Sequence, residues 1–182
     1  MDVLNRTTKE LRRSVNEPEY PEADWIHGPD LSAVAGHDSR YWVITGDAVT
    51  LATGDALAAI EAEVLAEAKA AKMAAIDAKS GQILTRGIEI EPGIWLSTTL
   101  PASQNLQVIW IGYQSSIPVF PVSISTLAGG AYTVANITAF SAIMSAFGSH
   151  KRGTLEAGQA LRAQVLACTT LAEVEAITDE RT

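Results

Sequence analysis

The stretch from Asp55 to Ile83 constrains the fold more than any other part of the sequence. It contains no proline, alanine dominates it, and its charged residues are glutamates and lysines that favour helix. The acidic side chains gather early and the lysines late, which complements the helix dipole. We therefore predict one long helix within residues 54–86, and Thr53 or Asp55 can cap its start.

One face of this predicted helix carries an apolar stripe that tapers from large to small side chains. With helical spacing, it consists of Leu57, Ile60, Val64, Ala68, Ala71 and Ala75. A helix of this length would extend about 40 Å at 1.5 Å per residue, more than a small domain needs. We expect the stripe to pair copies of the chain, as a trimer or hexamer, through close helix packing or a short coiled coil. Packing on the chain's own domain is the alternative.

Residues 1–53 are predicted to form an extended arm followed by a hairpin. Three prolines and Gly28 within residues 17–30 argue against a helix or a central strand there. Trp25 and Ile26 form an apolar pair in this arm, and such a pair docks either on its own subunit or on a neighbour. The β-prone runs 41–45 and 48–51 flank Gly46-Asp47, which is typical of a tight hairpin.

The hairpin contributes two further interaction candidates, Tyr41 and Trp42. A lone hairpin is marginally stable in water. We therefore expect it to pack on the following helix or to be extended by another chain.

Residues 87–182 are predicted to form a small α+β domain that ends in a helical subdomain. Short strands flank Pro92-Gly93, whereas the apolar run 106–113 suits either a strand or a buried helix. Three helices follow: one from Asn136 to a stop at Gly148, one over residues 154–167, and one that opens with a capping box at Thr170. The fold class is α+β, with segments 1–53, 54–86 and 87–182.

Composition excludes several classes of partner. The formal net charge is −8 and the pI is near 4.8, so the basic surface that nucleic-acid binding requires is missing. No apolar run approaches the roughly 20 residues of a membrane span. The sequence has a single cysteine, Cys168, which cannot form a disulfide within the chain, so the fold needs no oxidising compartment.

The sequence offers no catalytic, metal or cofactor motif. His27, His37 and His150 fall in separate predicted loops without the close ligand pairs of a zinc site. No phosphate-binding loop, dinucleotide fingerprint or nucleophile elbow appears. A third hypothesis is an enzyme such as a cell-wall hydrolase, which needs a pair of carboxylates in a cleft. The candidates for these carboxylates are Glu89, Glu91 and Glu156.

Two stretches carry a resemblance to known families. The first comprises residues 29–34, 39–43 and 46–49. It resembles a segment near the N-terminus of small phage tail-region proteins, where a Tyr-Trp strand and a hairpin precede an Ala-rich helix. The second comprises residues 76–79, 83, 87, 96–97, 104–105, 158–161, 169–174 and 177–181. It resembles a domain of unknown function at the C-termini of phage tail-fibre and tail-associated proteins. Residues 92–95 depart from that pattern, which has a glycine/aromatic turn there.

The resemblance implies a structural component of a bacteriophage virion, at the tail, baseplate or tail-fibre attachment, that acts through protein–protein contacts. It implies no catalytic residues. The chain would be synthesised in the host cytoplasm and would end up in the virion tail. A non-virion tail-fibre assembly chaperone is the alternative, and a tail-carried cell-wall hydrolase is a third.

Overall fold

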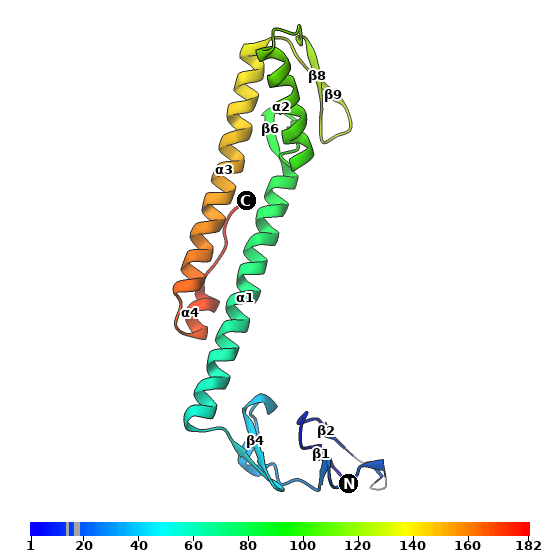
Figure 1. Cartoon of the computed structure of the whole chain (residues 1–182), viewed down its shortest axis with the longest axis vertical. Coiled ribbons are helices and arrows are strands. Elements are labelled where there is room, and N and C mark those ends of the chain that lie inside the picture. The colour runs from blue at the N-terminus through cyan, green and yellow to red at the C-terminus, as the bar shows by residue number, and fades with distance from the viewer. Residues whose placement is uncertain (14, 17–18) are drawn as a thin grey trace. The chain divides into compact units, whose positions relative to one another are not determined.

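The structure is a computed structural model that describes residues 1–13, 15–16 and 19–182 (Figure 1). Two residues of the proline-rich segment, Glu17 and Pro18, lie outside the described residues. The chain divides into two compact units, unit 1 (Met1–Ala66) and unit 2 (Glu67–Thr182). Helices and small antiparallel hairpins make up both, which confirms the predicted α+β class.

A three-stranded antiparallel sheet lies at the start of unit 1. The central strand β1 (Val3–Asn5) pairs with β2 (Leu11–Arg12) on one side and with β3 (Trp25–His27) on the other. The predicted arm therefore contains three short strands. Strand β3 lies between Pro21 and Pro29 and occupies an edge of the sheet, as expected for a strand in a proline-rich segment.

The predicted hairpin is confirmed. Two short 3-10 helices, η2 (Ser32–Val34) and η3 (Ser39–Tyr41), lead into β4 (Trp42–Thr45), which pairs with β5 (Ala48–Leu51). Thr45 faces Ala48, so Gly46-Asp47 forms the two-residue turn. Gly46 has a φ of +61°, which glycine adopts without steric cost.

The side chain of Arg6 connects this turn to the three-stranded sheet of unit 1. Arg6 donates to the Gly46 carbonyl at 2.6 Å and pairs with the Asp47 carboxylate at 2.6 Å. Beneath these contacts lies the core of unit 1. It consists of Leu4, Ile26, Val34 and Val49, all buried.

The long helix is confirmed as α1 (Gly54–Arg86), which begins in unit 1 and ends in unit 2. Gly87 ends it, with a φ of +81° and its N–H directed at the Ile83 carbonyl. A Cβ on Gly87 would lie 2.0 Å from the Leu96 carbonyl oxygen. Glycine is therefore required here both by the turn and by the close approach of the next hairpin.

Two hairpins and a helix follow α1 in unit 2. Strands β6 (Ile88–Glu91) and β7 (Ile94–Leu96) pair with each other, as do β8 (Val122–Ser125) and β9 (Ala131–Val134). Between them lies α2 (Leu100–Gln114), so the ambiguous run 106–113 is helical. Pro101 occupies its first turn, where its missing N–H has no partner to lose.

The chain continues in α3 (Ile137–Ala167), a single helix that Asn136 caps by accepting from the Ala139 N–H. The predicted stop at Gly148 is wrong. An interior glycine costs a helix only about 1 kcal/mol, and the burial of Phe147 and Thr154 on either side offsets it. After α3 comes α4 (Leu171–Ala176), whose predicted capping box between Thr170 and Glu173 is confirmed.

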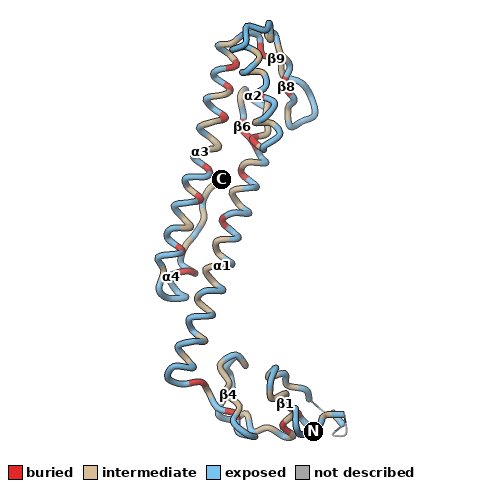
Figure 2. The backbone as a smooth tube through the Cα atoms, in the orientation of Figure 1, coloured by how far each residue is buried: buried red, intermediate tan, exposed pale blue. Residues whose placement is uncertain are grey.

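The core of unit 2 joins the start of α3 to both hairpins and to α2. In Figure 2, buried residues are coloured red along α3 and in the region of α2 and the two hairpins. The core consists of Ile88, Leu96, Leu106, Ile124, Val134, Phe140, Ile143 and Phe147.

Residues 177–182, here called the strap, run back between α1 and α3 (Figure 1). Lys72 and Lys79 of α1 donate to the backbone carbonyls of Ile177 and Asp179, at 2.9 and 2.8 Å. Arg181 pairs with Asp179 at 2.6 Å. It also donates to Ser80 Oγ and to carbonyls of both long helices. The strap therefore fastens α1 to α3.

Candidate interaction surface

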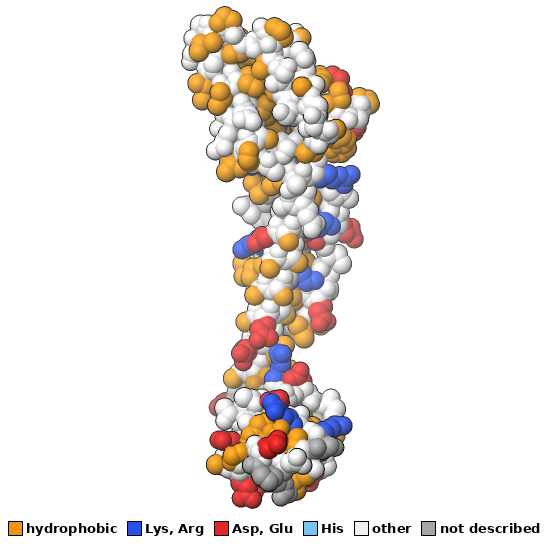
Figure 3. Space-filling model, turned by 90° about the vertical axis from the view of Figure 1, so that its right-hand side faces the viewer, with side chains coloured by type: hydrophobic (Ala, Val, Ile, Leu, Met, Phe, Trp, Pro, Cys, Tyr) orange, Lys and Arg blue, Asp and Glu red, His pale blue; other side chains and the backbone are white. Residues whose placement is uncertain are grey.

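Charged side chains are distributed very unevenly along the chain. All 13 Lys and Arg and all 21 Asp and Glu lie outside residues 92–150, here called the uncharged segment. This segment supplies β7, α2, the β8–β9 hairpin and the first half of α3. In the space-filling view, the end of unit 2 that it forms is almost entirely orange and white (Figure 3).

Helix α2 presents an apolar ridge on the outside of the uncharged segment. We define the α2 ridge as Leu100, Gln104, Val108 and Ile111, which share one face at helical spacing. Its three apolar side chains are 65%, 70% and 59% exposed in chain order. On the opposite face, Leu106 is buried and Ile109 and Trp110 are half-buried against the core. The helix is thus apolar on both faces, although the core of unit 2 covers only one.

A groove runs beside the ridge. The α2 groove has a volume of about 380 Å³, and α2 forms one wall of it through Pro101, Asn105 and Ile109. The other wall comes from the segment leading into α2 and from β8 and the turn after it. Those residues contribute hydroxyl and apolar groups, including Ser97, Thr99, Ser123, Ser125 and Leu127. Among the described residues that line the α2 groove, none carries a charge.

Aromatic rings connect the end of α2 to the core. Tyr113 lies 6.0 Å from Trp110 and 6.0 Å from Phe120, measured between ring centroids, and Phe120 lies 5.7 Å from Phe140. Phe140 is fully buried on α3. This chain of contacts fixes α2, so the ridge is presented by a packed element.

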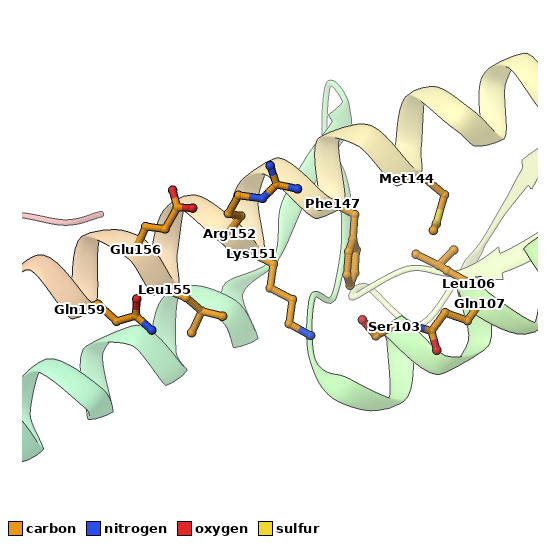
Figure 4. Close-up of a pocket in the computed structure, with 11 residues that line it drawn as sticks. Ser103, Leu106, Gln107, Met144, Phe147, Lys151, Arg152, Leu155, Glu156 and Gln159 are labelled. Atoms are coloured by element: carbon orange, nitrogen blue, oxygen red, sulfur yellow. The ribbon is translucent and has the colours of Figure 1, made fainter.

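A second groove, of about 450 Å³, lies between α2 and α3 on the other side of α2 (Figure 4). Leu106, Met144, Phe147 and Leu155 supply apolar lining, and Lys151 extends from α3 toward α2. Arg152 and Glu156 add charge at its end. This charged rim separates the second groove chemically from the α2 groove.

Two of the three carboxylates considered for a hydrolase accept hydrogen bonds in the structure. The Glu89 carboxylate accepts from the Gly93 N–H at 2.7 Å, within its own hairpin. Glu91 accepts from the Tyr132 hydroxyl, and this bond raises the pKa of Tyr132. Glu156 lies on α3 at the second groove. Among the described residues, no three His, Cys, Asp or Glu lie together as a metal site.

The four interaction candidates within residues 1–53 contribute to the packing of unit 1 itself. Ile26 is buried in the core of unit 1, so this residue docks on its own subunit. Trp25 is half-buried and meets Tyr20 edge-on at 4.9 Å. Trp42 packs on the core and donates to the His37 carbonyl at 3.2 Å. Tyr41 accepts from the Ala52 N–H through its carbonyl, at the base of the hairpin.

The α1 stripe is partly covered. Leu57, Ile60 and Val64 in unit 1 and Ala68 in unit 2 are half-buried, whereas Ala71 is exposed. Further along α1, Ile76 and Ile83 are buried within unit 2. Self-association through the stripe stays a prediction.

The α2 ridge was missed in the sequence analysis, although two signals mark it. One is the absence of charge over residues 92–150, and the other is the helical spacing of residues 100, 104, 108 and 111. Choosing helix over strand for this run required the tertiary structure.

Comparison with known proteins adds no relative. No family model, curated protein or solved structure matches this chain. Within the described part of the chain, no helix has the length and apolar character of a membrane span.

Proposed function

We propose that this chain is a structural subunit of a bacteriophage virion, at the tail, baseplate or tail-fibre attachment, and that it acts through protein–protein contacts. The observation that carries the contact role is the uncharged segment with its exposed α2 ridge. The phage assignment rests on two resemblances. Segments within residues 29–49 resemble small phage tail-region proteins, and segments within residues 76–181 resemble a domain of unknown function at the C-termini of phage tail-fibre and tail-associated proteins.

An uncharged, apolar surface suits a permanent contact for a physical reason. Burying a charge without a partner costs several kcal/mol, whereas burying Leu100, Val108 and Ile111 is favourable. The buried centres of protein interfaces are accordingly depleted in charged residues. A structural subunit that binds other subunits permanently would carry such a surface.

Purified particles of the encoding phage test this function. We expect the chain in a fixed copy number per particle, retained after washing at high salt, as measured by quantitative mass spectrometry. A particle without the chain would indicate an assembly chaperone if fibre attachment still depended on its gene. Release of peptidoglycan fragments by the purified chain would instead support a hydrolase.

A further inference from the structure

We propose that the α2 ridge and the α2 groove form one self-association surface, and that its occupant is a second copy of this chain. The proposed function uses this surface for contacts, and the present proposal names the partner that binds there. It rests on the proposed function only because both use the same surface. Three features of the described residues support it: charge, shape and rigidity.

Charge permits a second copy to bind at this surface and disfavours a strongly charged partner. Each copy carries a net charge of −8, so two copies repel unless they meet where charge is absent. The uncharged segment meets this condition, because residues 92–150 hold no Asp, Glu, Lys or Arg. A strongly charged partner would find no opposite charge there and would bury its own charges unpaired.

The same composition disfavours a membrane as the occupant. Helices that lie on membranes carry Lys and Arg along their polar face, where they meet anionic headgroups. The sides of α2 carry amides and a hydroxyl instead, at Ser103, Asn105, Gln107 and Gln114. Uncharged amides suit the rim of a protein interface.

Shape makes the surface complementary to itself. In a two-fold dimer, the same patch on both copies must fit itself. A ridge and a groove side by side on one helix can satisfy this requirement. A two-fold axis that runs parallel to α2, between the ridge and the groove, places each ridge opposite the other copy's groove. Helix α2 has 15 residues and is about 22 Å long at 1.5 Å per residue, so it gives about four turns of contact.

Rigidity lowers the cost of association. The ring contacts from Trp110 through Tyr113 and Phe120 to Phe140 hold α2 on the core. A surface that is already ordered loses little conformational freedom when it is covered.

The deciding experiment is the solution mass of the purified full-length chain, measured by light scattering across a concentration series. The test variant is Val108→Glu/Ile111→Glu, and the matched control is Leu166→Glu. Leu166 is 60% exposed near the end of α3, outside the proposed surface. We expect an oligomer for the wild type and the control, and a monomer for the test variant.

Folding is checked on the same samples. Val108 and Ile111 are largely exposed, so the test variant should keep the far-UV circular dichroism spectrum of the wild type and a single cooperative thermal transition. Its melting temperature should fall only by the stability that association gives the wild type. A second measurement does not depend on that variant. In a Cys168→Ser background, Gln104→Cys should give a covalent dimer with a short bis-maleimide crosslinker, whereas Gln159→Cys on α3 should not.

A wild-type chain that stays monomeric at all concentrations would overturn the proposal. If that monomer floated with neutral phosphatidylcholine vesicles, the occupant of the surface would be a membrane. An oligomer that survives Val108→Glu/Ile111→Glu but dissociates in Leu57→Asp/Val64→Asp would overturn it in favour of the α1 stripe. Recovery of the chain from virions despite a monomeric wild type would leave the proposed function intact. The two failures are therefore distinguishable.

Discussion

Arg181 is the residue through which the strap holds both long helices of unit 2. Its guanidinium pairs with Asp179 and donates to Ser80 and to the carbonyls of Ile76 and Thr154. Both charged side chains are largely covered, so removing one leaves the other poorly solvated. We expect Arg181→Ala to lower the free energy of unfolding by about 2–3 kcal/mol, because charged hydrogen bonds contribute on that scale.

Urea unfolding measures this loss. Arg152→Ala, which removes an exposed arginine of α3, is the matched control and should change stability by less than about 0.5 kcal/mol. Equal losses in the two variants would show that the contacts of Arg181 contribute nothing beyond those of an exposed arginine.

The Asp179–Arg181 pair also predicts a pH dependence. The hydrogen bond from Arg181 holds the pKa of Asp179 below its ordinary value of 3.8. A lowered pKa in the folded chain gives stability that is present above pH 3.8 and lost as pH falls through the folded pKa. We expect the difference in melting temperature between wild type and Asp179→Asn to be constant from neutral pH down to about pH 5 and to shrink below pH 4. A constant difference down to pH 2 would contradict this.

Two glycines of α3 should respond oppositely to alanine. A Cβ on Gly158 would lie 2.8 Å from Nη1 of Arg181 and 3.0 Å from Oγ of Ser80, whereas Gly153 has nothing within 4 Å. We expect Gly158→Ala to destabilise by about 1–2 kcal/mol through overpacking, and Gly153→Ala to stabilise by about 0.5–1 kcal/mol through helix propensity. Thermal unfolding distinguishes them.

A double variant tests the cause of the Gly158 effect. In the Arg181→Ala background, the loss of stability caused by Gly158→Ala should be smaller, because the two residues are in contact. An unchanged penalty would assign it to Ser80 or to the helix backbone.

At the scale of elements, the junction between α1 and β6 depends on Gly87. Gly87 and Gly93 both have a φ of +81°, but only Gly87 approaches the backbone of another strand, at Leu96. Alanine at Gly93 should cost about 1–2 kcal/mol, the cost of a left-handed conformation. Alanine at Gly87 should cost about 3 kcal/mol or more, because overpacking adds to that conformational cost. Equal losses of unfolding free energy in urea would mean that the backbone at Leu96 shifts to accommodate the added Cβ at no cost.

Elements with a local signal were predictable. The hairpin of β4 and β5 follows from Gly46-Asp47 between β-prone runs, and the start of α4 follows from the reciprocal hydrogen bonds of Thr170 and Glu173. The length of α3 was not predictable, because tertiary packing around Phe147 overrides the weak helix-breaking effect of Gly148.

At the scale of the whole molecule, the uneven distribution of charge predicts how association responds to salt. Copies with a net charge of −8 repel over distances that salt shortens to about 10 Å at 0.1 M. The proposed α2 contact contains no ion pair for salt to weaken. We expect the association constant to rise as NaCl is added, in sedimentation equilibrium experiments. A fall with added NaCl would point to a contact made by charged surfaces.

The sequence by itself determined the long helix, the hairpin, the capped start of α4 and the α+β class. Each follows from propensities and short-range hydrogen bonds among neighbouring residues. The tertiary structure alone decided that residues 100–114 form a helix with one face uncovered. It also decided that the strap pairs Arg181 with α1 and α3. These outcomes depend on contacts between residues far apart in the chain, and local patterns carry no information about which distant surfaces meet.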